Sequence, residues 1–148
     1  MLSLMEEEVA TNLALMQYIR DLAGRDQQAL SEGEMLIEPF PVLTSGGWNL
    51  MRADLPRWMP HHSSVLARFR SGAIAAGQLN QLMLNRESYK VNRRSSPQFI
   101  ATMQDYDDAI VEKIELVEKA TRALQRELWE MESALGIKPR SGSEPPGA

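Results

Sequence analysis

The hydrophobic residues of the last third of the chain recur at steps of three and four, which is the spacing of one face of an α-helix. They are Phe99, Met103, Tyr106, Ile110, Ile114, Val117, Thr121, Leu124, Leu128, Met131 and Leu135. No Gly or Pro interrupts residues 98–135, so the pattern predicts one helix over residues 96–135 with a narrow hydrophobic seam. Two consecutive steps of four, from Tyr106 through Ile110 to Ile114, break the heptad repeat and predict local unwinding of a supercoil.

This helix is expected to join protomers. At 1.5 Å per residue it is roughly 55–60 Å long, which is longer than a globular domain of 148 residues needs. The expected oligomerisation residues are Met103, Tyr106, Ile110, Ile114, Val117, Leu124, Leu128 and Met131. The alternative is that the seam packs against other parts of its own protomer.

Two further helices are predicted from the same periodicity. Residues 2–23 form the first, and Gly24 is its expected end because Gly is favoured just after a helix. The second begins near residues 61–64 and ends near Leu84. Gly72 and Gly77 within it are interpreted as a place where another backbone crosses closely, because glycine has no side chain to prevent that approach.

The segments between these helices are rich in residues that break helices. Pro39 and Pro41 exclude a helix around Phe40, and Trp48 begins a short helix that ends before Pro56. The expected divisions are an N-terminal amphipathic helix (1–24), a linker (25–47), a helical core for oligomerisation (48–136) and a flexible tail (137–148). Residues 85–96 are expected to be a basic polar connection. The predicted fold is all-α: a helical hairpin core with a long, coiled-coil-like C-terminal helix and short irregular connections.

Composition adds limits on where the chain functions. Hydrophobic residues make up 43% of the 148 residues, enough for a core, and Cys is absent, which suits a reducing compartment. No hydrophobic run reaches the roughly 18–20 residues that span a bilayer. We expect a cytoplasmic protein without a membrane partner, in the host cell cytoplasm if the protein is viral.

The net charge of −4 conceals an acidic–basic–acidic layout. Residues 39–96 carry eight bases and two acids, whereas both flanking segments are acidic. Clustered bases favour binding to polyanions. The expected DNA-binding residues are Arg57, Arg68, Arg70, Lys90, Arg93 and Arg94. The alternative is that the basic segment pairs with the acidic helices of another protomer.

An active site is hard to assemble from this sequence. His61 and His62 are adjacent and point in different directions, so they are a poor metal chelate. Asp105, Asp107 and Asp108 are interpreted as a solvated acidic face. Phosphate-binding loops and nucleophile motifs are absent from the sequence. We therefore expect no catalytic residue, no metal and no cofactor, and a protein that is not an enzyme.

Two stretches resemble the small terminase subunits of tailed bacteriophages. In many members a short helix bearing a Trp is followed by a corner and by a helix that begins Leu-Ala-x-Tyr. Here Trp48 marks the short helix, residues 58–62 read Trp-Met-Pro-His-His, and residues 66–69 read Leu-Ala-Arg-Phe. Residues 134–141, Ala-Leu-Gly-Ile-Lys-Pro-Arg-Ser, are similar to the Leu-Gly-Leu-x-Pro-x-x-Arg ending of one branch. A His replaces the corner Asp of the family, and residues 1–47 match no part of it.

The resemblance implies a DNA-packaging protein. Such a subunit forms a homo-oligomeric ring, binds double-stranded viral DNA and regulates the large terminase subunit, which carries the motor and the nuclease. It implies no ATP site in this chain. The alternative function is an oligomeric coiled-coil interaction protein, such as a phage scaffold, adaptor or host-takeover factor, that binds no nucleic acid.

Overall fold

A computed structural model describes residues 2–36, 38–54, 57, 61 and 63–136. This part of the chain contains no strand, and its helices are α1 (Leu2–Ser31), α2 (Gly46–Met51), α4 (Ser63–Asn92) and α5 (Phe99–Ala134). The all-α prediction with a long C-terminal helix is confirmed. The tail predicted at residues 137–148 lies outside the described residues.

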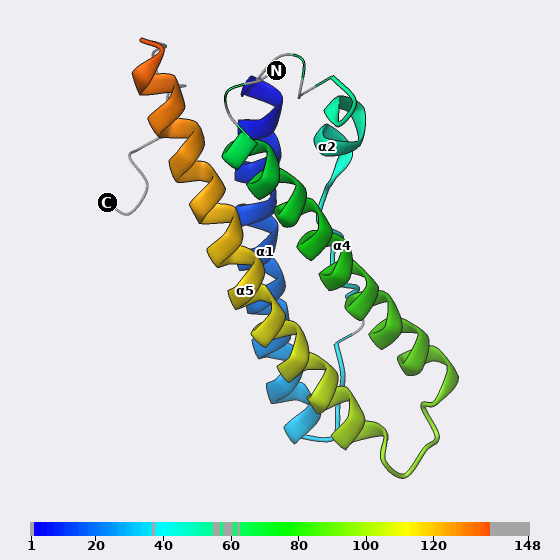
Figure 1. The fold of residues 1–148 in the computed structure, drawn as a ribbon. Helices are drawn as coiled ribbons and strands as arrows, with labels where there is room; N and C mark the ends of the chain where they lie inside the picture. Colours follow the sequence, from blue (N-terminus) through cyan, green and yellow to red (C-terminus); the bar gives the residue numbers. More distant parts are fainter. Residues whose placement is uncertain (1, 37, 55–56, 58–60, 62, 137–148) are drawn as a thin grey trace.

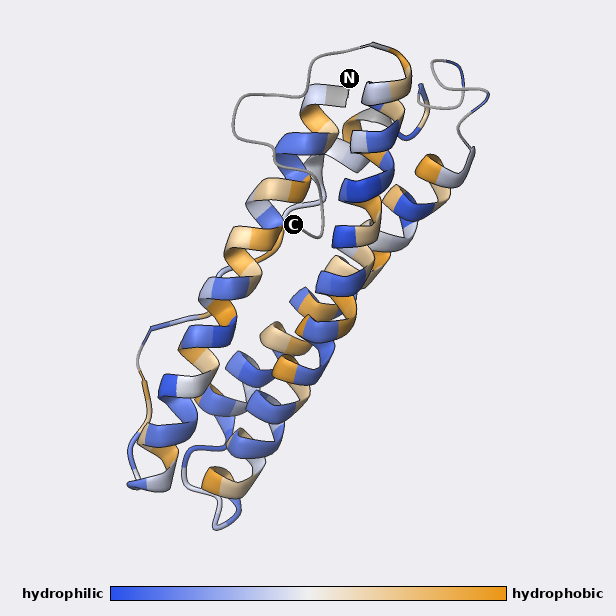
Figure 2. Ribbon diagram, turned by 90° about the vertical axis from the view of Figure 1, so that its left-hand side faces the viewer, coloured by the Kyte–Doolittle hydropathy of each residue, from blue (hydrophilic) through white to orange (hydrophobic). Residues whose placement is uncertain are grey.

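Three long helices lie side by side and form an elongated bundle (Figure 1). α1 and α4 run in the same direction, and α5 returns antiparallel to both (Figure 1). α5 packs against α4 and against α1, so it is the element that holds the other two together. Figure 2 shows hydrophobic residues alternating with hydrophilic ones along these helices, as amphipathic helices require.

The seam of α5 packs inside its own protomer. Its buried hydrophobic residues are Phe99, Met103, Ile110, Ile114, Val117, Leu124, Leu128 and Met131. They contact α1 residues such as Met16 and α4 residues such as Leu79 in continuous core clusters. Most of the residues expected to join protomers are thus buried by α1 and α4 within one protomer, as the alternative interpretation of the seam has it, and their role in oligomerisation stays a prediction.

The inward position next to Met103 is held by Asp107 instead of Tyr106. Asp107 is fully buried, whereas Tyr106 is half-buried at the side of the bundle. From Asp107 onward the buried positions follow one another at steps of three and four. The two consecutive steps of four therefore lie at Phe99, Met103 and Asp107 instead of at Tyr106, Ile110 and Ile114, because the buried position is an aspartate, which a hydrophobic pattern does not count as core.

α1 is about two turns longer than predicted, since it passes through Gly24 and ends at Ser31. Its buried face continues after Gly24 with Asp26 and Leu30. A helical Gly costs only about 1 kcal/mol relative to Ala, and the burial of Leu30 offsets that cost. The positive φ that ends the helix is found at Gly33, with a φ of 78°.

α4 is also longer than predicted and continues from Leu84 to Asn92. The reason is that Arg86 continues its buried face beyond Leu84. Within the protomer no other described backbone crosses closely at Gly72 or Gly77, because a Cβ at either position would meet nothing within 4 Å.

Residues 34–36 and 38–45, hereafter the connection, run back along the bundle from the end of α1 to α2 (Figure 1). Phe40 and Leu43 are buried in the core. The amide of Leu43 donates to Asn80 Oδ1 at 2.7 Å, and Asn80 Nδ2 donates to the Leu43 carbonyl at 2.8 Å. Asn12 makes the same pair of bonds with Thr44, both at 2.8 Å. The connection is therefore a packed part of the fold.

None of the described helices is both long enough and hydrophobic enough to cross a membrane.

Candidate anion-binding site

The six bases expected to bind DNA do not form one surface. Arg68 and Lys90 lie 22 residues apart on α4, which is about 33 Å along the helix axis. Arg93 and Arg94 follow the end of α4, and Arg57 precedes its start. The sequence-predicted residues therefore occupy opposite ends of the bundle.

Two of these six bases have partners within the protomer. Lys90 is half-buried, and its Nζ donates to the Leu36 carbonyl at 3.0 Å. Arg68 Nε pairs with Glu127 Oε1 at 2.7 Å. The other four, Arg57, Arg70, Arg93 and Arg94, are exposed and have no ion pair among the described residues.

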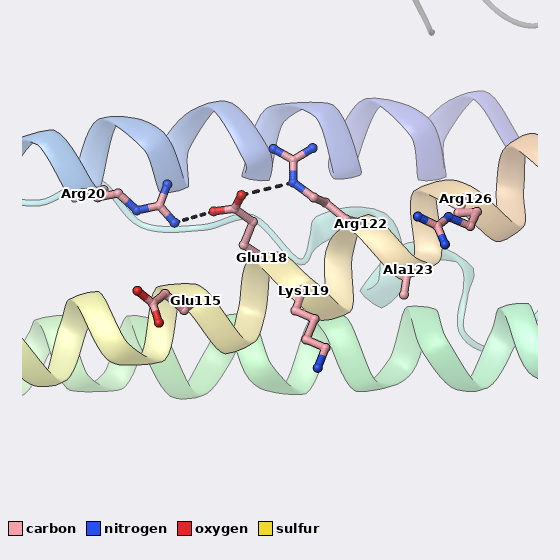
Figure 3. A pocket seen from close by; sticks show the side chains of 7 residues that line it. All are labelled: Arg20, Glu115, Glu118, Lys119, Arg122, Ala123 and Arg126. Atoms are coloured by element: carbon pink, nitrogen blue, oxygen red, sulfur yellow. Dashed lines mark hydrogen bonds and ion pairs between the residues drawn. The ribbon is translucent and has the colours of Figure 1, made fainter. Parts of the chain in front are cut away.

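A different set of bases gathers on α1 and α5 around an open groove of about 530 Å³. This basic groove is lined by Arg20 from α1 and by Glu115, Glu118, Lys119, Arg122, Ala123 and Arg126 from α5 (Figure 3). Four cations and two carboxylates give it a formal charge of +2.

The spacing on α5 explains why these bases share one side. Lys119, Arg122 and Arg126 follow one another at steps of three and four, which places them on one helix face. The seam residues Val117, Thr121 and Leu124 are buried against the bundle. Because these seam residues face the core, Lys119, Arg122 and Arg126 on the other side of the helix face outward.

Glu118 fixes two of the cations. It accepts a hydrogen bond from Arg20 across the helix boundary and one of 3.1 Å from Arg122 Nε (Figure 3). Arg20 is the main reason that the pKa of Glu118 lies below its usual range, and Arg122 contributes as well. Lys119 and Arg126 have no ion pair with any described residue, so their charges are available to a ligand.

The sequence prediction missed this groove because charge was summed over long segments. Residues 97–148 are acidic as a whole, but residues 119–126 contain three bases and no acid. The spacing of Lys119, Arg122 and Arg126 is the signal that a search by helix face finds. Arg20, 99 residues earlier than Lys119, cannot be added without the structure.

Arg93 contributes to a second, polar groove at the other end of the bundle, of about 490 Å³. It is lined by Asn85, Ser88, Tyr89, Asn92, Arg93 and Tyr106. The ring of Tyr89 stacks on Phe99 with centroids 5.9 Å apart and lies 5.8 Å from Tyr106. The structure thus brings together a predicted DNA-binding residue and a predicted oligomerisation residue.

The most deeply buried charges belong to a cluster around Arg86, which is 1% exposed. Its guanidinium pairs with Asp26 at 2.5 Å, with Asp107 at 2.7 Å and with Glu87 at 2.8 Å. It also lies 4.4 Å from the centre of the Phe40 ring. These contacts join α1, α4, α5 and the connection, and Arg86, Asp26 and Asp107 are closed off from solvent, so the Arg86 cluster is a structural element.

The two buried aspartates of this cluster titrate differently. Burial raises the pKa of Asp107 to about 8, and its hydrogen bond with Asp26 acts in the same direction. Asp26 has a lowered pKa because hydrogen bonds from Asp107, Leu36 and Arg86 outweigh its burial. At pH 7 we therefore assign one buried cation, one buried carboxylate and one neutral carboxylic acid. The interpretation of Asp107 as part of a solvated acidic face is wrong.

Comparison with protein-family models, with curated proteins and with solved structures gave no match to this chain. The two sequence stretches that resemble small terminases include residues 58–60, 62 and 137–141, which lie outside the described residues.

Proposed function

We propose that this chain is a non-enzymatic helical subunit that binds the phosphate backbone of nucleic acid. The observation that carries the proposal is the basic groove, where Arg20, Lys119, Arg122 and Arg126 lie around one surface depression. Bases that neutralise phosphates supply most of the affinity of sequence-independent nucleic-acid binding. We therefore propose this groove as the DNA contact in place of the six bases expected from the sequence.

The shape of the groove favours a polymer over a small molecule. Lys119 and Arg126 are seven residues apart on α5, so two turns of helix, about 10 Å, separate them. The side chains that line the groove follow α5 from Glu115 to Arg126, with Arg20 of α1 beside them (Figure 3). A phosphate chain can lie along such a row, and arginine guanidinium groups match phosphate geometry with two parallel hydrogen bonds.

The resemblance to small terminases supplies the biological setting of this proposal. In that setting the chain forms a ring, binds viral double-stranded DNA and acts on a large terminase subunit. These parts are supported by the sequence resemblance alone. The solution mass measured by light scattering tests the ring directly, since a closed ring requires many protomers.

The first test compares two double variants with the same change in formal charge. Lys119→Glu with Arg126→Glu removes the two unpaired cations of the basic groove, and Arg93→Glu with Arg94→Glu changes the polar end of the bundle. Binding to labelled double-stranded DNA is measured by fluorescence anisotropy between about 50 and 200 mM salt. The groove variant should bind at least about tenfold more weakly, with a salt slope reduced by about 2.

Two outcomes would contradict the proposal. If only the Arg93/Arg94 variant loses affinity, the polar groove makes the contact. If the wild-type protein keeps its helical circular dichroism spectrum and binds no DNA at low salt, the alternative of an interaction protein without nucleic-acid binding replaces it.

A further inference from the structure

The outward side of α4 carries no charge over more than five turns. The exposed residues between Arg70 and Arg93 are Ser71, Ile74, Gly77, Gln78, Gln81, Leu84, Asn85, Ser88, Val91 and Asn92. By contrast, the exposed side of α5 includes Asp105, Asp108, Glu112, Glu115, Lys119, Arg122, Arg126 and Glu130. Depletion of charge is a property of the central part of protein–protein interfaces.

The half-buried charges of the same stretch of α4 are used within the protomer. Glu87 pairs with Arg86, and Lys90 donates to the Leu36 carbonyl. They therefore do not alter the neutral character of the exposed side.

Within this side, one set of positions follows the heptad spacing of a coiled-coil seam. Ile74, Gly77, Gln81, Leu84, Ser88 and Val91 succeed one another at steps of three and four. This set, hereafter the outer face of α4, is separate from the buried face that contains Phe69, Ala76, Leu79, Met83 and Arg86. Ile74 is 52% exposed, Leu84 59% and Val91 76%.

We propose that the outer face of α4 is a twofold contact between copies of this protein, separate from the contacts that would close a ring, and that it packs antiparallel against the same face of a second copy. A twofold axis near residues 82 and 83 would relate the two helices. The layers would pair Ile74 with the partner's Val91, Gly77 with the partner's Ser88, and Gln81 with the partner's Leu84, each layer occurring twice. Hydrophobic pairs then lie at both ends, and a small-residue layer allows close approach.

Charge identifies the occupant as a second copy of the chain. In a twofold interface the same patch contacts itself, so charged residues on it would face one another or need exact pairing. A neutral patch has no such restriction. It also has no cation to pair with phosphates, so nucleic acid is not the expected partner of this face. A parallel pairing would place Arg70 against Arg70, whereas the antiparallel register leaves Arg70 beyond the last layer.

The size of the surface sets the strength of the contact. Residues 74–91 of α4 are about 26 Å long, and a helix pair of this length buries on the order of 1,000 Å² in total. That is the lower limit for a specific interface, so the dimer should be reversible and dependent on concentration. α4 lies at the edge of the bundle in Figure 1, and the basic groove lies on α1 and α5. The dimer therefore leaves the proposed nucleic-acid surface open.

The test measures sedimentation velocity from about 1 to about 500 µM protein, concentrations around a micromolar dissociation constant. Leu84→Glu places a charge on the outer face of α4. Leu116→Glu is the matched control, because Leu116 is an equally exposed leucine (60%) on α5. Wild type and L116E should dimerise alike, and L84E should dissociate at least about tenfold more readily. A wild-type protein that stays monomeric, or an L116E variant that alone loses the dimer, overturns the proposal.

The antiparallel register has its own test, because the chain contains no cysteine. A mixture of the single variants Ile74→Cys and Val91→Cys should form the mixed disulfide on oxidation, in excess over either homodisulfide. A preference of the Ile74→Cys variant for linkage to another copy of itself would instead show parallel packing and overturn the register. DNA binding is measured separately with the groove variant, so the failure of one proposal does not resemble the failure of the other.

Discussion

Arg86 shows how a single buried side chain can organise three helices. Its guanidinium has fixed directions for its N–H donors, and these meet Asp26 of α1, Asp107 of α5 and Glu87 of its own helix. Removing one member of such a buried network leaves the others without partners, which costs more than the network contributes when complete. The cluster therefore specifies how the helices are aligned along their length.

The protonation of Asp107 should make the stability of the fold depend on pH. Its carboxyl keeps a proton up to about pH 8 in the folded state, compared with a pKa of 3.8 for an ordinary Asp. Between these values the unfolded state binds fewer protons, so this residue makes stability fall as the pH rises. Asp107→Asn imitates the neutral form. The variant should be within about 1 kcal/mol of wild type at pH 5 and more stable at pH 9, by urea denaturation. A variant equally destabilised at both pH values would show that Asp107 is ionised in the fold.

At the scale of elements, hydrophobic spacing predicted the three long helices but not where they end. The missing parts of α1 and α4 both contain buried polar residues, Asp26 and Arg86, that a hydrophobic pattern does not count as core. Their burial is possible only because each is the partner of the other, at 60 residues' separation. The sequence of one helix alone therefore could not reveal it.

The basic groove was unpredictable for a related reason. Three of its bases are recognisable from their spacing on α5, but the fourth is Arg20 of α1. Which faces of α1 and α5 lie next to each other depends on the packing of the whole bundle. The clustering of bases in residues 39–96 predicted a DNA contact on and near α4 instead, where the structure leaves the bases dispersed.

The connection is held to α4 by the side chain of Asn80. Asn80 satisfies both the amide and the carbonyl of Leu43, and Leu43 is buried. Asn80→Ala should lower the free energy of unfolding by about 2 kcal/mol, because two backbone groups lose their partners. The control is Asn49→Ala in α2, whose side chain only approaches the Ser45 hydroxyl at 3.5 Å; it should change stability by less than about 0.5 kcal/mol. Equal effects of the two substitutions in thermal denaturation would contradict this role of Asn80.

At the scale of the whole molecule, two buried acids give the fold the same pH dependence. Burial raises the pKa of Glu132 to about 7, and the nearby Glu6 adds to this, while Asp107 reaches about 8. Both carboxyls lose their proton as the pH increases, and the free energy of unfolding falls because a buried charge is unfavourable. Asp26 and Glu118 have lowered pKa values and act oppositely, because they lose stabilising interactions only in more acidic solution.

The melting temperature should therefore be highest at about pH 4, close to the ordinary pKa values of the carboxyls, and should decline toward pH 9. Glu132→Gln should remove part of the decline, and the double variant with Asp107→Asn should remove most of it, as followed by circular dichroism. Glu130→Gln, at an exposed position on the same helix, is the control and should leave the profile unchanged. A flat profile for wild type would contradict the assignment of these two neutral acids.

The parallel course of α1 and α4 has a consequence for how the molecule folds. α4 and α5 are consecutive in the sequence, so their pairing closes only the short loop between them. α1 must find α5 across a long stretch of chain, as the Arg20–Glu118 contact shows with its separation of 98 residues. Closing a long loop costs more conformational entropy than closing a short one. We expect the α4–α5 hairpin to assemble early and α1 to dock last. The first partial unfolding event would then be the release of α1, which bares the hydrophobic seam of α5 and makes exchange of α1 between two chains the characteristic misfolding route of this protein.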